Sequence, residues 1–121
     1  MLDVEPMVKK FEKELSAGTV SLLLLAQLAK SDAPLYGYQI AKQLEQAGEG
    51  LLGSKQSALY PVLRNMDAAG LLQSEVEPSV SGPPRRYYRI TDFGREVFTA
   101  WRNRWQQTES LVNTVLQGAP L

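Results

Sequence analysis

Residues 54–91 contain a helix-forming segment and two alternating segments, an order that few folds accommodate. In the first part, Leu59 and Leu63 recur at helical spacing and share one apolar face with their neighbours. Gly70 follows this pattern and can end a helix, because a residue without a Cβ adopts the left-handed cap conformation at little cost. We therefore predict a helix over about 55–69.

The two alternating segments predict a β-hairpin. Residues 72–77 alternate apolar and polar side chains, and residues 84–91 are aromatic and β-branched at their centre. The second segment carries Arg85, Arg86 and Arg89. A short helix followed by a basic hairpin is the layout of a winged helix, in which the helix enters the major groove and the hairpin lies beside the phosphates.

Two further helices are predicted ahead of this unit. Residues 5–29 are predicted to form a long helix in two parts, and the part after Gly18-Thr19 is apolar nearly all round. The sequence leaves open whether Gly18 breaks this helix. The next helix is predicted over 35–47, with Tyr36 in the core and Tyr38 on the surface. Two helices joined by a short glycine-containing connection, here this helix and the one over 55–69, are typical of a helix-turn-helix.

The last predicted element is a helix over 92–117 with an apolar seam. Its large residues follow one another in steps of three and four, as in a coiled coil: Phe98, Trp101, Trp105, Thr108, Val112 and Val115. Such a helix is about 39 Å long, and a small winged helix cannot cover its seam. Because monomers rarely expose large apolar patches, we predict a homodimer formed through the first and last helices.

The predicted fold is therefore mainly α with a small β-wing. It divides into a winged helix-turn-helix DNA-binding domain, 1–91, and a C-terminal dimerisation helix, 92–121.

Composition argues against an enzyme. The chain has no cysteine and no histidine, the commonest metal ligand and general base, and it has no glycine-rich phosphate loop. We expect no catalytic residues, no metal and no cofactor. The first residues are charged and the longest apolar run, Leu22–Ala26, is far shorter than the roughly 20 residues that span a bilayer. We expect a soluble cytoplasmic protein that does not associate with a membrane.

Charge is distributed unevenly along a chain whose formal net charge is zero. Residues 54–105 carry eight basic and five acidic side chains, whereas residues 1–53 carry five and seven. The basic segment suits contact with phosphate, but zero net charge keeps an alternative open. The alternative is a dimeric winged-helix module that binds protein, and salt dependence separates the two readings because DNA contacts release counterions.

The order of these motifs resembles the PadR family of bacterial transcriptional regulators. The resemblance covers residues 18–95, and its motifs are Gly18-Thr19, Leu35–Ile40, Ser57–Leu63, Ala69–Leu72 and Arg85–Thr91 with Gly94. The chain departs from the family pattern at Ser57-Ala58, where Gly-Thr is usual, and at Met66-Asp67, where Leu-Glu is frequent. The short C-terminal region is similar to the small subfamily that includes the lactococcal multidrug-binding repressor.

The resemblance implies a dimeric repressor that binds a roughly two-fold DNA operator, with C-terminal helices that swap across the dimer. In the multidrug-binding members, a tryptophan on the last helix stacks on planar drugs at the dimer interface. Trp105 occupies the matching position, and Trp101 lies one turn earlier. The same side chains could instead be dimer core, since aromatic pairs stabilise an interface by packing alone.

The candidate DNA contacts come from the second helix, the third helix and the hairpin: Tyr38, Lys55, Gln56, Ser57, Tyr60, Arg64, Arg85 and Arg86. The start of a recognition helix usually reaches the base edges, whereas Tyr60 and Arg64 are equally suited to phosphate. Side chains alternate across a strand, so Arg85 and Arg89 share one side, Arg86 faces the other, and not all three can face one duplex. We expect Arg85 and Arg86 to lie near phosphate at the tip of the wing and Arg89 to be structural.

Overall fold

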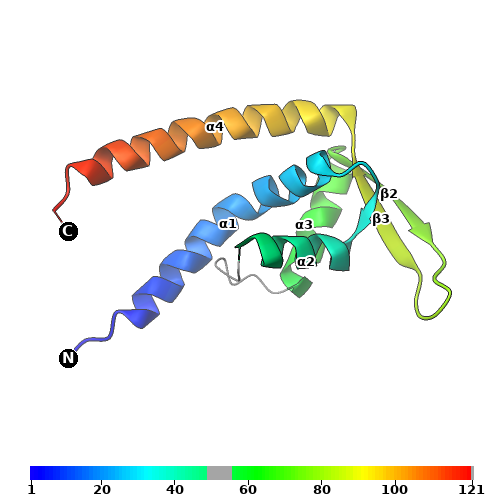
Figure 1. The fold of residues 1–121 in the computed structure, drawn as a ribbon, viewed down its shortest axis with the longest axis horizontal. Helices are drawn as coiled ribbons and strands as arrows, with labels where there is room; N and C mark the ends of the chain where they lie inside the picture. The colour runs from blue at the N-terminus through cyan, green and yellow to red at the C-terminus, as the bar shows by residue number, and fades with distance from the viewer. Residues whose placement is uncertain (49–55, 121) are drawn as a thin grey trace.

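The computed structural model describes residues 1–48 and 56–120. The elements are α1 (Glu5–Lys30), β1 (Leu35–Tyr36), α2 (Gly37–Gly48), α3 (Gln56–Ala68), β2 (Leu72–Glu77), β3 (Arg85–Ile90) and α4 (Asp92–Gln117). Figure 1 shows α1 and α4 as two long arms, with the β2–β3 hairpin projecting from the opposite end. The predicted fold class, mainly helical with a small wing and a long last helix, is confirmed.

The sheet has three antiparallel strands in the order β1-β3-β2. The predicted two-stranded hairpin therefore lacked one strand, because Leu35 pairs with Tyr88 and Tyr36 pairs with Tyr87. The predicted helix start at 35 was wrong by two residues, since α2 begins at Gly37. A two-residue strand is too short to show alternation in the sequence. It forms because Leu35 is buried in the core while its backbone bonds to the free edge of β3.

The two expected parts of the first helix form one continuous helix, and Gly18 does not break it. A single glycine costs a helix only about 1 kcal/mol relative to alanine. The helix begins where the Asp3 Oδ1 accepts a hydrogen bond from the Glu5 N–H at 3.0 Å. Lys30 in the last turn complements the negative end of the helix dipole.

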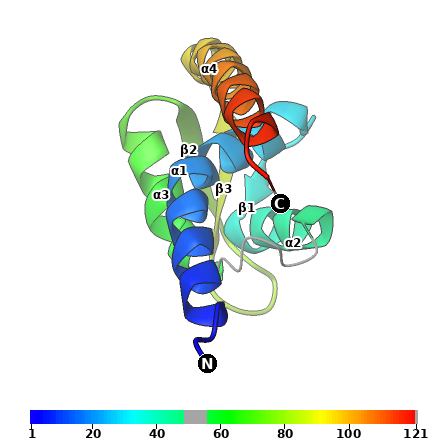
Figure 2. The ribbon, with the colours of Figure 1, turned by 90° about the vertical axis from the view of Figure 1, so that its left-hand side faces the viewer.

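The core lies where the second half of α1 meets α2, α3 and the sheet. Figure 2 shows α1 with α3 and α2 on either side of it and with α4 above. The predicted inward face of α3 is confirmed, since Leu59, Leu63 and Met66 are buried. The first turns of α4 also pack on this core through Val97, Phe98 and Trp101. The proposed division of the chain at residue 91 stays a prediction.

Two hydrogen-bonded turns connect α3 to the elements that follow it. Gly70 has a φ of 84° and ends α3 as predicted, with the Leu71 N–H donating to the Met66 carbonyl at 2.9 Å. Thr91 caps α4, where its Oγ1 accepts from the Gly94 N–H at 2.9 Å. The same hydroxyl donates to the Gly70 carbonyl at 2.6 Å. The first turn of α4 is thereby joined to the turn between α3 and β2.

Candidate nucleic-acid interface

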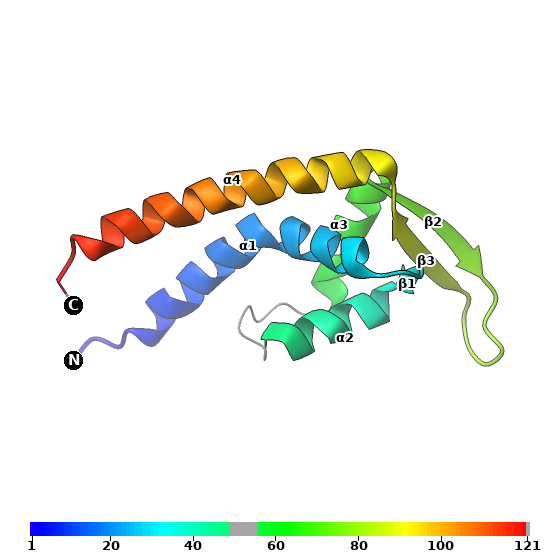
Figure 3. The ribbon, with the colours of Figure 1, turned by 45° about the horizontal axis from the view of Figure 1, so that its top comes forward.

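The start of α3 and the tip of the hairpin point to the same side of the molecule in all three ribbon views (Figures 1, 2 and 3). On α3, Tyr60 and Arg64 lie on the face opposite the buried leucines and are exposed. Lys55 lies outside the described residues, and of Gln56 and Ser57 only the helical backbone is described. The arrangement can place one helix and one hairpin against the same duplex.

Tyr60 packs directly on the first residue of α2. A Cβ added to Gly37 would lie 2.2 Å from the Tyr60 Cε1, far inside van der Waals contact, so only glycine permits this approach. The ring therefore holds the start of α2 against α3. Sequence reasoning placed Tyr60 on the DNA-facing side and missed this contact, although both residues stand in family motifs.

The outer face of the sheet carries an aromatic cluster with basic groups around it. Tyr36 and Tyr87 meet edge to face at 5.4 Å between ring centroids, and the Arg85 guanidinium lies 4.4 Å from the Tyr36 centroid. Stacking of this kind leaves the edge of a guanidinium free to bind phosphate. Arg89 shares this face, and its Nη2 donates to the Gln73 Oε1 at 3.1 Å, as suits the structural role expected for it.

Tyr38 extends the aromatic cluster onto the exposed surface of α2. Its ring stacks with that of Tyr36 at 6.4 Å and 16° between planes, and the Lys42 Nζ lies 5.9 Å from its centroid. Tyr38 is 48% exposed, as predicted. Lys42 was not among the predicted contacts, and its spacing of one helical turn after Tyr38 was the available signal. The start of α2 thus presents a phenol and an ammonium group together.

Arg86 lies on the opposite face of β3 from Arg85. Its Nη1 donates to the Ser74 Oγ at 3.0 Å, and Ser74 in turn donates to the Asp67 carboxylate in the last turn of α3. Tyr88 is buried beside this group, and desolvation raises the pKa of its phenol, with smaller effects from Arg86 and Asp67. Sequence reasoning expected both arginines near phosphate and did not find this network.

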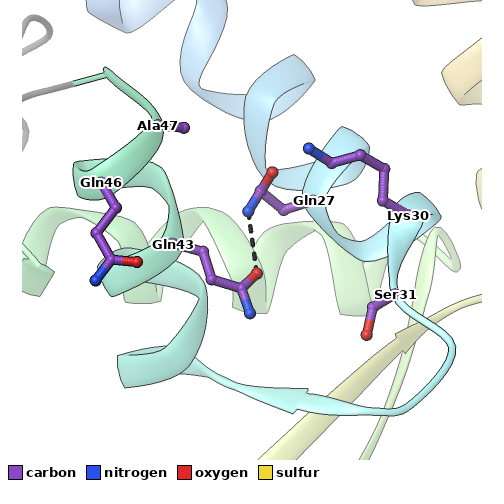
Figure 4. Close-up of a pocket in the computed structure, with 6 residues that line it drawn as sticks. All are labelled: Gln27, Lys30, Ser31, Gln43, Gln46 and Ala47. Carbon is purple, nitrogen blue, oxygen red and sulfur yellow. Dashed lines mark hydrogen bonds between the residues drawn. The ribbon is translucent and has the colours of Figure 1, made fainter.

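A polar cavity of about 360 Å³ lies between α1 and α2, away from the hairpin (Figure 4). Its lining residues are Gln27, Lys30, Ser31, Gln43, Gln46 and Ala47. Gln27 is 8% exposed, and its Nε2 donates to the Gln43 Oε1 at 3.0 Å. Among the residues that the structure describes, Gln27 is the one buried polar side chain of the core, and Gln43 accepts the hydrogen bond of its amide. This pair links the two helices.

The two tryptophans of α4 have different surroundings. Trp101 packs against the core, whereas Trp105, one turn later, is 38% exposed. Beyond Trp105 every side chain of α4 within the described residues is exposed.

None of the described helices combines the length and the hydropathy that crossing a bilayer requires. Nor do the described residues gather three His, Cys, Asp or Glu side chains that could hold a metal ion.

Helices α1, α2 and α3, packed on a three-stranded sheet with a projecting hairpin, define a winged helix-turn-helix, a class of DNA-binding protein. The chain belongs to the PadR-like family of transcriptional regulators, whose family model matches residues 24–100. The predictions of family, transcription regulation, DNA binding and winged helix-turn-helix are confirmed. The prediction that the chain is not an enzyme is also confirmed, because the family consists of regulators.

Known proteins resemble the chain over nearly its whole length. A transcriptional regulator of Mycobacterium tuberculosis is 33% identical over 106 residues, which cover 88% of this chain and 91% of that protein. The crystal structure of a PadR family regulator from Eggerthella lenta is 33% identical with a TM-score of 0.81, covering 95% of this chain and 96% of that one. A PadR-like regulator from Bacillus cereus is 28% identical with a TM-score of 0.71, covering 88% and 99%.

Proposed function

We propose that the chain is a homodimeric repressor whose binding to a roughly two-fold DNA operator is modulated by a small planar or aromatic ligand. The similarity of its short C-terminal region to the small subfamily of the lactococcal multidrug-binding repressor supports this proposal. The observation that carries it is the pair of uncovered apolar stripes on α1 and α4.

The apolar stripes lie on the parts of α1 and α4 that extend beyond the core. The two helices approach each other where α1 ends and α4 begins, and they diverge toward the chain termini (Figures 1 and 3). The exposed apolar side chains are Val4 just before α1, Met7, Val8, Phe11 and Leu15 on α1, and Trp105, Leu111, Val112, Val115 and Leu116 on α4. Burying each such side chain contributes about 1.5–3 kcal/mol, so a second copy of the chain would stabilise both helices.

The dimer is tested by placing charge on the stripe of α4. Leu111→Glu combined with Val115→Glu should give a monomer in light scattering at concentrations where the unmodified chain is a dimer. Ser110→Glu combined with Thr114→Glu is the matched control, because it adds the same two charges to the opposite side of the same helix. A double variant that stays dimeric would exclude this stripe from the interface.

The proposed DNA contacts belong to two sets. The start of α3, with Lys55, Gln56 and Ser57, is proposed to reach base edges, as the first residues of a recognition helix do. Tyr38, Tyr60, Arg64 and Arg85 are proposed to contact phosphates, which position the protein without reading sequence. Exposure of Tyr38, Arg64 and Arg85 on the side of the hairpin supports the second set.

The phosphate set is tested by the salt dependence of DNA binding. We expect tight binding to DNA from just upstream of the chain's own coding region, falling steeply with salt. Arg64→Ala together with Arg85→Ala should flatten the slope of log affinity against log salt by about 0.9 per lost contact. An unchanged slope would remove these residues from the set, and salt-independent binding to a protein would favour the protein-binding alternative.

Trp105 is the proposed ligand contact. A flat indole that is 38% exposed on the dimer stripe could meet its symmetry mate and leave a slot for a planar aromatic molecule. Trp101 is the weaker candidate, because its ring already packs on the core.

The chain has two tryptophans, so Trp101→Phe leaves Trp105 as the sole indole fluorophore. Quenching of that variant by a planar aromatic dye, but not by an aliphatic amine of equal charge, is the expected result. Trp105→Ala should abolish dye binding while the chain stays dimeric. Dye binding that survives this change would place the ligand elsewhere.

A further inference from the structure

A hydrogen-bonded chain of three side chains connects the recognition helix to the wing. Asp67 lies in the last turn of α3, Ser74 in the middle of β2 and Arg86 near the start of β3. The Arg86 Nη1 donates to the Ser74 Oγ at 3.0 Å, and the Ser74 hydroxyl donates to the Asp67 Oδ2. The two outer members of this network, Arg86 and Asp67, are charged, and a charged partner roughly doubles the strength of a hydrogen bond.

Strand register explains why Arg86 can take part and Arg85 cannot. Ser74 pairs with Tyr88, so these two residues and Arg86 share the face of the sheet that packs toward α3. Arg85, one residue earlier, faces the other way and lies over Tyr36. The charges of Arg86 and Asp67 both act on the buried Tyr88 phenol, which places them at the same junction.

We infer that Arg86 is a positioning residue, held through Ser74 by Asp67, that fixes the wing at a set angle to the recognition helix. This role differs from the phosphate contact predicted for it from the sequence. Arg85 keeps its guanidinium on the outer face. Of the two adjacent arginines, Arg85 is therefore the proposed phosphate contact and Arg86 positions the wing.

Because Asp67 is acidic, the direction in which its substitution changes DNA affinity tests the inference. A carboxylate on the recognition helix repels phosphate, so Asp67→Asn would tighten DNA binding if only net charge mattered. If Asp67 instead anchors Arg86, the same substitution weakens binding, because the wing loses its fixed position. Glu75→Gln is the matched control: it also removes one negative charge, but from the outer face of β2, where Glu75 pairs with Tyr87 and not with Arg86.

The experiment measures affinity at several salt concentrations for a duplex from just upstream of the chain's own coding region and for a random duplex of equal length. Asp67→Asn and Ser74→Ala should each weaken binding by roughly twofold to 150-fold, the fold-change that corresponds to the coupling energies of networked residues. Arg86→Ala should do the same, and combining it with Asp67→Asn should add little. None of the three should change the salt slope, whereas Arg85→Ala should flatten it.

Two readouts separate positioning from a general loss of structure. Ser74→Thr keeps the hydroxyl and should restore affinity, while circular dichroism should show all variants folded. Hydrogen exchange, which requires no DNA, should show faster exchange of the β2–β3 amides in Asp67→Asn than in Glu75→Gln.

The inference rests on the proposed binding of DNA through α3 and the wing. Different outcomes distinguish failure of the proposed DNA contacts from failure of the positioning role. A salt slope left unchanged by Arg64→Ala and Arg85→Ala would overturn the proposed contacts alone. Tighter binding by Asp67→Asn, a flattened slope for Arg86→Ala, or equal exchange in the two acidic variants would overturn the positioning role.

Discussion

Replacing Gly37 with alanine should destabilise the fold, because the Tyr60 ring already fills the space that a Cβ would take. The added carbon would lie 2.2 Å from Cε1 and 3.0 Å from Cδ1 of that ring. Contacting carbon atoms are about 3.5–4.0 Å apart, so the ring would have to retreat by roughly 1 Å or more. The Tyr60 ring is 36% exposed, so it can make room for the added carbon only by giving up its contact with the start of α2.

The expected cost follows from two opposing effects. Overpacking of this kind costs about 1–3 kcal/mol, while alanine is favoured over glycine in a helix by up to about 1 kcal/mol. We therefore expect the free energy of unfolding to fall by about 1–2 kcal/mol. DNA affinity should fall as well, since the ring sets the position of α3 against α2.

Urea unfolding measures this change, and α2 supplies its own control. A Cβ added to Gly48 meets nothing within 4 Å, so Gly48→Ala should be neutral or slightly stabilising. Truncating the ring makes room, so Gly37→Ala combined with Tyr60→Ala should cost less than the sum of the single changes. Equal unfolding midpoints for Gly37→Ala and Gly48→Ala would refute the reasoning.

Three other substitutions test separate features. Thr91→Ala should lower the free energy of unfolding by about 1 kcal/mol or more, because α4 loses its cap, and Thr91→Ser should restore most of it in urea unfolding. Gln27→Leu should cost under about 1 kcal/mol, since Gln43 is exposed and can bond to water; a larger loss would show that the amide pair itself holds α1 to α2. Burial raises the pKa of Tyr88 above its usual value of about 10, so the folded state holds this proton more tightly than the unfolded chain. The stability due to this shift is complete below pH 10 and is lost as pH rises through the raised pKa, and a Tyr88→Phe variant with an unaltered alkaline profile of unfolding would contradict this.

The helices and the hairpin could be predicted from the sequence because each has a local period. The apolar spacing of Leu59 and Leu63, and Gly70 after them, reports a helix and its end within a few residues. The strand at Leu35 escaped prediction because two residues show no period and its pairing partner lies about fifty residues further along the chain. A long helix tolerates one glycine, so the sequence left open whether Gly18 breaks α1, and the structure shows one continuous helix.

The candidate site was predicted by residue type but not by contact. Composition identifies Arg85 and Arg86 as basic residues of a wing, and alternation shows that they face apart. Strand pairing between segments that are distant in the sequence decides which face of the hairpin packs on α3. The same pairing places Ser74 on that face, between Arg86 and the Asp67 carboxylate of α3. The Tyr60 contact with Gly37 depends in the same way on how α2 crosses α3.

The hydroxyl of Thr91 turns α4 into a lever with a fixed base. Through Gly70 it joins the first turn of α4 to the end of the recognition helix, and the whole of α4 is about 39 Å long. A tilt of about 5° at this base would move the far end by roughly 3 Å over that length. In a dimer joined by α4, a small shift at the interface would thus change the distance between two recognition helices, which DNA requires to match its repeat of about 34 Å.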